Sequence, residues 1–116
     1  FYGKIINIHP SLLPKYPGLN THKKVIENKD SFHGVSVHYV SEELDAGPLI
    51  AQGTIKTYQG ENINDLIERI HKIEHILYPE VIKFICKKQI YLDLNKIVYK
   101  DISIDNKDFI YKNYEI

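Results

Sequence analysis

The chain has 116 residues, the length of one domain, and its 15 basic residues balance 15 acidic ones. Hydrophobic residues make up 43% and charged residues 26%, which excludes a disordered chain. The zero net charge argues against nucleic-acid partners, and no apolar run reaches the roughly 18 residues that span a membrane. The single cysteine, Cys86, suits a reducing compartment, so we expect a cytoplasmic protein.

The chain opens on an apolar segment followed by a proline-rich one. Residues 3–8 predict a short buried strand, apolar on both faces as strands of parallel sheets are. Residues 9–18 contain three prolines, which restrict the backbone and predict a rigid loop. Thr21 is expected to cap a short helix that ends near Asn28.

Two β-rich segments and a long helix follow. Residues 32–41 and 49–57 alternate as strands do, and an acidic loop joins them, so we expect antiparallel neighbours. Asn62 is expected to cap a helix that ends near Lys88, with Pro79 kinking it. Its apolar stripe consists of Ile63, Leu66, Ile67, Ile70, Ile73, Leu77, Val81, Phe84 and Ile85.

The remaining residues predict short β structure. Residues 90–94 and 96–99 are expected to form a hairpin with Asn95 in its turn, and residues 101–116 to form short strands. The whole pattern predicts an α/β class with one core.

Asn7 and His9 lie two residues apart near the end of the first strand, so their side chains project to the same side. Ligands of open α/β sheets bind at such strand ends. An amide beside an imidazole suits acyl transfer, because it can donate to an oxyanion while the imidazole moves a proton. The alternative is that Asn7 only ends the strand and His9 is a hydrogen-bonded, half-buried histidine.

Asp45 lies in an acidic loop with Glu42 and Glu43, whose side chains are expected to be solvated. The residues on either side of Asp45 do not favour solvent, which sets it apart from the two glutamates. If the loop folds over the end of the sheet, the carboxylate would favour the protonated form of His9.

The helix also carries a histidine pattern. His71, Glu74 and His75 match the H-x-x-E-H motif of inverted zinc peptidases, and the two histidines share a helix face. Only 41 residues follow His75 to provide a further ligand. The alternative is an exposed polar face opposite the apolar stripe.

Other candidate groups carry weaker signals. His38 shares a strand face with Ser36, which is either solvated or lines a cleft. His22 and His33 belong to no constellation, and Cys86 is expected to be an inert core thiol. The sequence has no glycine-rich phosphate-binding loop.

A long ordered motif identifies a family resemblance. The run from Asn7 to Gly18, N-I-H-P-S-L-L-P-K-Y-P-G, strongly resembles the signature of folate-dependent formyltransferases. The resemblance continues through Thr21-His22, His33-Gly34-Val35-Ser36-Val37-His38, Leu44-Asp45-Ala46-Gly47-Pro48, Glu74-His75 and Tyr78-Pro79. It implies the C-terminal part of a Rossmann-like formyltransferase fold, with a mixed sheet, a long C-terminal helix and a terminal β-hairpin.

The resemblance also implies a reaction. The residues after the loop are more similar to the branch that formylates phosphoribosylglycinamide in purine biosynthesis than to the methionyl-tRNA branch. We therefore expect formyl transfer from 10-formyltetrahydrofolate to the amine of phosphoribosylglycinamide, without a metal. The alternatives are a methionyl-tRNA or other folate-dependent formyltransferase or hydrolase, a non-catalytic binding fragment, and a zinc peptidase.

By the same resemblance, three groups of residues receive roles. The implied catalytic residues are Asn7, His9 and Asp45. The implied folate contacts are Asn7, Ser41, Glu42, Glu43, Leu44 and Asp45. The implied substrate contacts are His71, Lys72, Ile73 and Glu74.

Family members begin with a half that binds the substrate phosphate through a glycine-rich turn. Nothing in residues 1–116 resembles that half, and the chain lacks methionine. We therefore expect residues 1–116 to be a single domain, the C-terminal catalytic portion of a formyltransferase, with residue 1 an interior point of a longer protein. The expected partners are the N-terminal half, the two small substrates and, through an exposed strand edge, a second copy of the chain.

Overall fold

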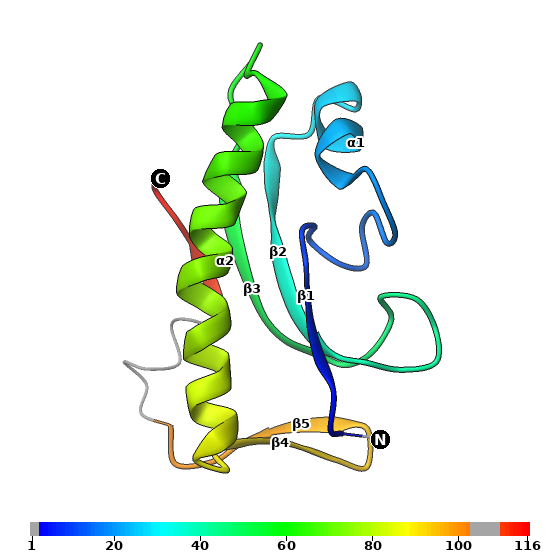
Figure 1. Cartoon of the computed structure of the whole chain (residues 1–116), viewed down its shortest axis with the longest axis vertical. Coiled ribbons are helices and arrows are strands. Elements are labelled where there is room, and N and C mark those ends of the chain that lie inside the picture. The colour runs from blue at the N-terminus through cyan, green and yellow to red at the C-terminus, as the bar shows by residue number, and fades with distance from the viewer. Residues whose placement is uncertain (1–2, 103–109) are drawn as a thin grey trace.

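The computed structural model describes residues 3–102 and 110–116 as a mixed sheet, two helices and a separate hairpin (Figure 1). The sheet has the order β1-β2-β3-β6, formed by β1 (Ile6–His9), β2 (Phe32–Tyr39), β3 (Leu49–Lys56) and β6 (Tyr111–Asn113). β2 is antiparallel to β1 and to β3, as predicted for the second pair, whereas β6 is parallel to β3. The mixed sheet confirms the predicted α/β class.

Helix α2 (Ile63–Cys86) lies along one face of the sheet and packs on β2 and β3 (Figure 1). The side chain of Asn62 caps it by accepting a hydrogen bond from the N–H of Asn64 at 2.7 Å, which confirms the predicted start. The helix continues through Pro79. Its buried residues are Leu66, Ile70, Ile73, Leu77, Val81 and Phe84, and their burial against the sheet forms most of the core.

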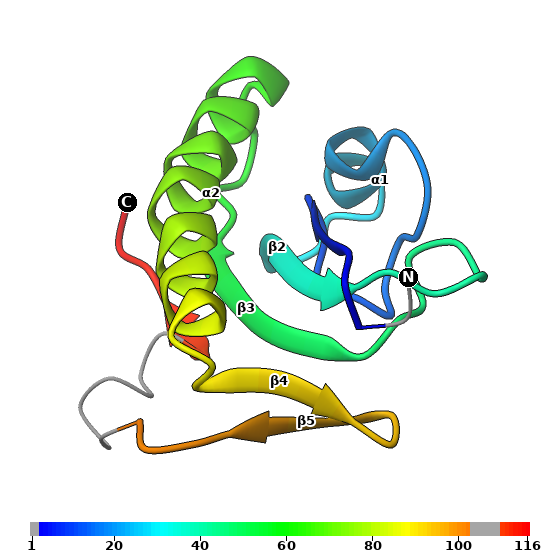
Figure 2. The ribbon, with the colours of Figure 1, turned by 60° about the horizontal axis from the view of Figure 1, so that its bottom comes forward.

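Hairpin β4 (Ile90–Asp93) and β5 (Lys96–Tyr99) lies across the end of α2, outside the main sheet (Figure 2). Its two turn residues, Leu94 and Asn95, have φ angles of 48° and 65°, as a tight hairpin turn requires. The predicted hairpin is confirmed, and the Tyr99 hydroxyl joins it to β3 by donating to the Ile50 carbonyl at 2.6 Å. Among the described residues, no helix is long and apolar enough to cross a membrane.

The predicted short strands of residues 101–116 are represented by β6 alone in the described part of the chain. Residues 103–109 lie outside the described residues.

The first strand differs from the buried parallel strand that the sequence predicts. β1 is antiparallel to β2 and has no strand on its other side within the described residues. Asn7 is exposed, and Ile6 and Ile8 are only half-buried. A short apolar run indicates a strand but not the direction of its neighbour, because both kinds of sheet bury such runs.

Two local predictions are wrong. Helix α1 (Thr21–Glu27) begins at Thr21, and the cap position is taken by Asn20, which has a φ of 61° and makes no side-chain cap hydrogen bond. Cys86 is exposed rather than buried. It follows Phe84, the last buried residue of α2, by two positions and therefore projects to the opposite side of the helix.

Gly34 lets the proline-rich loop lie directly on the sheet. A Cβ atom at Gly34 would be 2.0 Å from the carbonyl oxygen of Gly53 and 2.6 Å from Cδ2 of Leu12. The first of these atoms belongs to backbone, so a side chain fits here only if β2 and β3 separate.

We expect Gly34→Ala to lower the free energy of unfolding by about 3 kcal/mol, because it overpacks a site closed by backbone. Gly60→Ala is the matched control, since a Cβ there has open space but the φ of 74° disfavours it. The control should lose only about 1 kcal/mol. Urea unfolding measures both variants, and equal losses would contradict the proposed overpacking.

Candidate active site

The proline-rich loop after β1 is held on the sheet by polar side chains of β2 and β3. The Ser36 hydroxyl donates to the Ser11 carbonyl at 2.7 Å and accepts from the Leu13 N–H at 3.1 Å. The Gln52 amide donates to the Leu13 carbonyl at 2.8 Å. These bonds satisfy backbone groups that would otherwise be buried without partners, so the loop has one fixed path.

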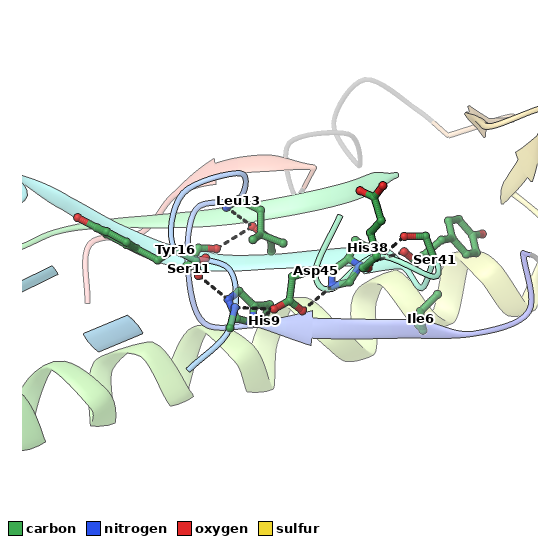
Figure 3. A network of polar contacts seen from close by, with 12 residues as sticks. Ile6, His9, Ser11, Leu13, Tyr16, His38, Ser41 and Asp45 are labelled. Atoms are coloured by element: carbon green, nitrogen blue, oxygen red, sulfur yellow. Dashed lines mark hydrogen bonds and ion pairs between the residues drawn. The ribbon is translucent and has the colours of Figure 1, made fainter. Parts of the chain in front are cut away.

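His9 ends β1 and is 5% exposed. Its Nε2 donates to the Tyr16 carbonyl at 2.8 Å, and its Nδ1 lies 3.4 Å from Oδ2 of Asp45 (Figure 3). Both ring nitrogens therefore face oxygen acceptors. The doubly protonated imidazole is the form that satisfies both contacts.

The acceptor carbonyl of Tyr16 is itself anchored. Tyr16 has a φ of 53°, and its phenol donates to Oδ2 of Asp30 at 2.6 Å. The same phenol oxygen accepts from the side-chain amide of Asn28 at 2.8 Å. This anchoring keeps the Tyr16 carbonyl beside His9.

The acidic loop folds over the end of the sheet and brings Asp45 to His9. Asp45 has a φ of 51°, and its Oδ2 accepts the N–H of Gly18 at 2.8 Å. Its side chain is 8% exposed. Gly47 permits the return path of the loop, because a Cβ there would be 1.7 Å from the Tyr39 carbonyl oxygen.

Asn7 lies on the same face of β1 as His9, and it is exposed. It is paired across the strands with His38. Its amide is therefore open to solvent at the border of the buried His9–Asp45 pair, the position that an incoming molecule could reach.

His38 belongs to the same cluster, although the sequence left its role open. It is 2% exposed, its Nδ1 donates to the Tyr39 carbonyl at 2.9 Å, and its Nε2 lies 3.7 Å from Oδ1 of Asp45 (Figure 3). Strand alternation placed it on one face with Ser36, but only the packed structure shows that the loops carrying Asp45 and Ser11 cover this face.

The predicted folate contacts form a surface beside this cluster. Ser41, Glu42 and Glu43 are exposed and line a cavity of about 880 Å³, together with Asn95 from the hairpin turn. Leu44 is 73% exposed. Their contact with a folate stays a prediction.

The predicted substrate contacts lie on α2, and one of them needs correction. His71 and Lys72 are exposed and Glu74 is half-buried, and burial raises the pKa of Glu74. Ile73 is fully buried, with its Cγ2 only 2.6 Å from where a Cβ at Gly53 would lie. The helical period assigns Ile73 to the core stripe, so its side chain is not available to a substrate.

The zinc alternative gains no support from the fold. His71 and His75 are both exposed on α2. Within residues 3–102 and 110–116, no group of three histidine, cysteine or acidic side chains is placed to hold a metal ion.

His22 and His33 form a pair that the sequence analysis missed. Nδ1 of His22 lies 3.0 Å from Nε2 of His33, which is 1% exposed. Burial lowers the pKa of His33 to about 3, with a further contribution from His22. Burial also lowers the pKa of His22, with smaller contributions from His71 and His9. No sequence signal joins residues eleven apart on a helix and a strand.

This pair makes stability fall in acid. The pKa of His33 is lowered in the folded chain, so the unfolded chain binds the proton more tightly, and stability is complete above pH 6.5 and lost as the pH falls below it. Between pH 7.5 and 5.5 we expect a loss of about 1.4 kcal/mol from His33. Urea unfolding at both pH values tests this, with His33→Gln as the reference that lacks the titrating ring. An equal pH dependence of the two proteins would refute the assignment.

The comparison with known proteins agrees with the geometry. The family described as formyl transferase matches residues 1–82. The chain belongs to the formyl transferase family. Phosphoribosylglycinamide formyltransferase of Escherichia coli strain K12, a formyl transferase, is 49% identical over 84 residues, which cover 72% of this chain and 40% of that protein.

Solved structures of formyl transferases have the same fold. The crystal structure of phosphoribosylglycinamide formyltransferase from Anaplasma phagocytophilum matches with a TM-score of 0.87 and 33% identity, over 98% of this chain and 54% of that one. A formyltetrahydrofolate deformylase from Pseudomonas syringae pv. tomato matches with a TM-score of 0.79 and 27% identity, over 85% of this chain and 33% of that one. The chain thus spans about half the length, or less, of the relatives it matches.

Proposed function

We propose that the chain is the catalytic portion of an enzyme that transfers a formyl group from 10-formyltetrahydrofolate to the amine of phosphoribosylglycinamide. The observation that carries this proposal is the cluster of Asn7, His9 and Asp45 at the end of β1, with His9 3.4 Å from Asp45. Support comes from two relatives named phosphoribosylglycinamide formyltransferase, which are 49% and 33% identical to this chain.

The proposed reaction begins when the amine nitrogen attacks the formyl carbon and forms a C–N bond. The carbonyl oxygen then becomes an oxyanion, which the exposed amide of Asn7 and the protonated ring of His9 are suited to stabilise. Cleavage of the bond to nitrogen 10 of the folate completes the transfer. The attacking amine loses one proton and nitrogen 10 gains one, so the route requires proton transfer but no metal.

His9 is the proposed proton donor, and its contacts indicate which nitrogen acts. Nδ1 faces the Asp45 carboxylate, whereas Nε2 donates to the Tyr16 carbonyl. A neutral carbonyl holds a proton less strongly than a carboxylate does. We infer that Nε2 exchanges the Tyr16 carbonyl for the reacting group, while Asp45 keeps Nδ1.

The proposed binding surfaces for the two substrates are the acidic loop and helix α2. We propose that the folate lies against residues 41–45 in the cavity beside them, and that His71, Lys72 and Glu74 meet the phosphoribosylglycinamide. We also propose a cytoplasmic location, where both substrates would be found.

The open edge of β1 is the proposed attachment point of an N-terminal half. β1 pairs only with β2 among the described residues, and Ile5 at its start is 46% exposed. A strand added there would satisfy the free backbone groups and cover Ile5. The substrate phosphate site would lie on that half.

The test is a chimeric protein in which this chain replaces the matching region of the Escherichia coli relative. We expect formyl transfer to phosphoribosylglycinamide, measured by loss of 10-formyltetrahydrofolate together with appearance of formylated product. Formate release without formylated product would instead indicate a hydrolase. A folded chimera that does neither would overturn the proposal.

A further inference from the structure

His38 is a buried titratable side chain for which the proposed reaction has no role. It lies in β2, is 2% exposed, and is directly opposite Asn7 of β1. Within the described residues its Nε2 has no hydrogen-bond partner, although Oδ1 of Asp45 lies 3.7 Å away. A buried polar atom aimed at a carboxylate at this distance needs a reason, because burial without a partner costs free energy.

The orientation of the His38 ring is fixed by its other nitrogen. Nδ1 must donate to the Tyr39 carbonyl at 2.9 Å, since a carbonyl oxygen can only accept. Nε2 therefore repels the carboxylate if the ring is neutral and donates to it if the ring is protonated. The side chains of His38 and Asp45 are 3% and 8% exposed, so little water screens the pair.

The carboxylate of Asp45 divides its contacts between its two oxygens. Oδ2 accepts the N–H of Gly18 at 2.8 Å and lies 3.4 Å from Nδ1 of His9. Oδ1 lies 3.7 Å from Nε2 of His38. Asp45 has a φ of 51°, in the left-handed region that aspartate tolerates better than most residues, so the loop can turn its carboxylate toward these partners.

We propose that His38 is a positioning residue that holds Oδ1 of Asp45 through Nε2–H and so keeps Oδ2 on His9 and on the Gly18 N–H. The charged groups facing the pair are His9 from β1 and Asp45 itself, with Glu42 and Glu43 exposed farther along the loop. The contribution of His38 to turnover rests on the proposed function. The positioning of Asp45 does not, because it is a property of the folded chain.

Two substitutions of His38 test the roles of its two ring nitrogens separately. In His38→Asn, the shorter amide nitrogen occupies the place of Nδ1, so it retains the donor to Tyr39 and removes the donor to Asp45. In His38→Gln, the longer amide nitrogen occupies the place of Nε2 and retains the donor to Asp45. Both variants are polar and no larger than the space that the side chain leaves, so packing alone affects them similarly.

The N–H of Gly18 reports on the Asp45 carboxylate without any assay of activity. We expect His38→Asn to speed amide hydrogen exchange at Gly18 by about tenfold, measured by NMR on the whole chain, while α2 amides are unchanged. His38→Gln should stay within about threefold of the parent chain. Equal exchange at Gly18 in all three proteins would overturn the proposal, and so would equal acceleration in both variants.

Turnover supplies the second measurement. In the chimera, His38→Asn is expected to lower kcat about tenfold with KM for both substrates nearly unchanged, and His38→Gln should restore most of the loss. A fall in both variants, or a rise in KM alone, would contradict a positioning role. If the parent chimera has no turnover, the proposed function fails, whereas the Gly18 exchange result still decides whether His38 positions Asp45.

Discussion

His9→Ala in the chimeric enzyme is expected to lower formyl transfer at least about 10²-fold while the protein stays folded. The substitution removes the ring that contacts both Asp45 and the Tyr16 carbonyl, and with it the proposed proton donor. Asn7→Ala should have an effect of similar size, because one oxyanion donor contributes about 2.7–4 kcal/mol in comparable sites.

Single-turnover and steady-state measurements of formylated product provide the test. His75→Ala is the matched control, since it removes an exposed histidine from α2 that has no place in the proposed site. The control should keep normal turnover, and circular dichroism should show unchanged helix in all three variants. Near-normal turnover of His9→Ala would remove His9 from the mechanism.

The second large effect concerns the chain without a partner. We expect the isolated chain to associate with itself and to have no measurable formyl transfer, because β1 has an open edge and Ile5 beside it is 46% exposed. Sedimentation velocity over a range of concentrations, with turnover assayed on the same samples, measures both properties. A monomer with normal turnover would show that no upstream half is needed.

A charged residue at the β1 edge distinguishes association by strand pairing from non-specific apolar association. Ile5→Lys should reduce the association strongly, since a lysine on an edge strand opposes pairing with another strand. Ile76→Lys is the control, because Ile76 is 51% exposed on α2 and is not part of the sheet edge. Association that both variants reduce equally would indicate non-specific apolar contact.

Much of the fold follows from local sequence signals. Asn62 and the apolar stripe predicted α2, and the turn around Asn95 predicted the hairpin, because caps, helical periodicity and tight turns depend on residues close in the chain. The direction of β1 could not be predicted in the same way. It depends on which strand lies beside it, and the apolar run of residues 3–8 is compatible with either direction.

The candidate site could also be predicted only where its residues are close in the sequence. The shared face of Asn7 and His9 follows from strand alternation, whereas the contact between His9 and Asp45 joins residues on separate loops. The pair formed by His22 and His33 was missed for that reason, and the role of His38 was left open, because only the packed structure brings these residues together. Ile73 was assigned to a substrate although its position in the helical period already placed it in the core.

The way in which the proline-rich loop is held also orders the events of folding. Its backbone bonds to Ser36, Asp45 and Gln52 span 23, 27 and 39 residues of sequence. Such contacts form only after β2, β3 and the acidic loop have come together, because closing long loops precedes the gain from the bonds. The candidate site therefore forms late in folding and is lost early in unfolding. A partly unfolded chain can retain helix α2 without an organised site.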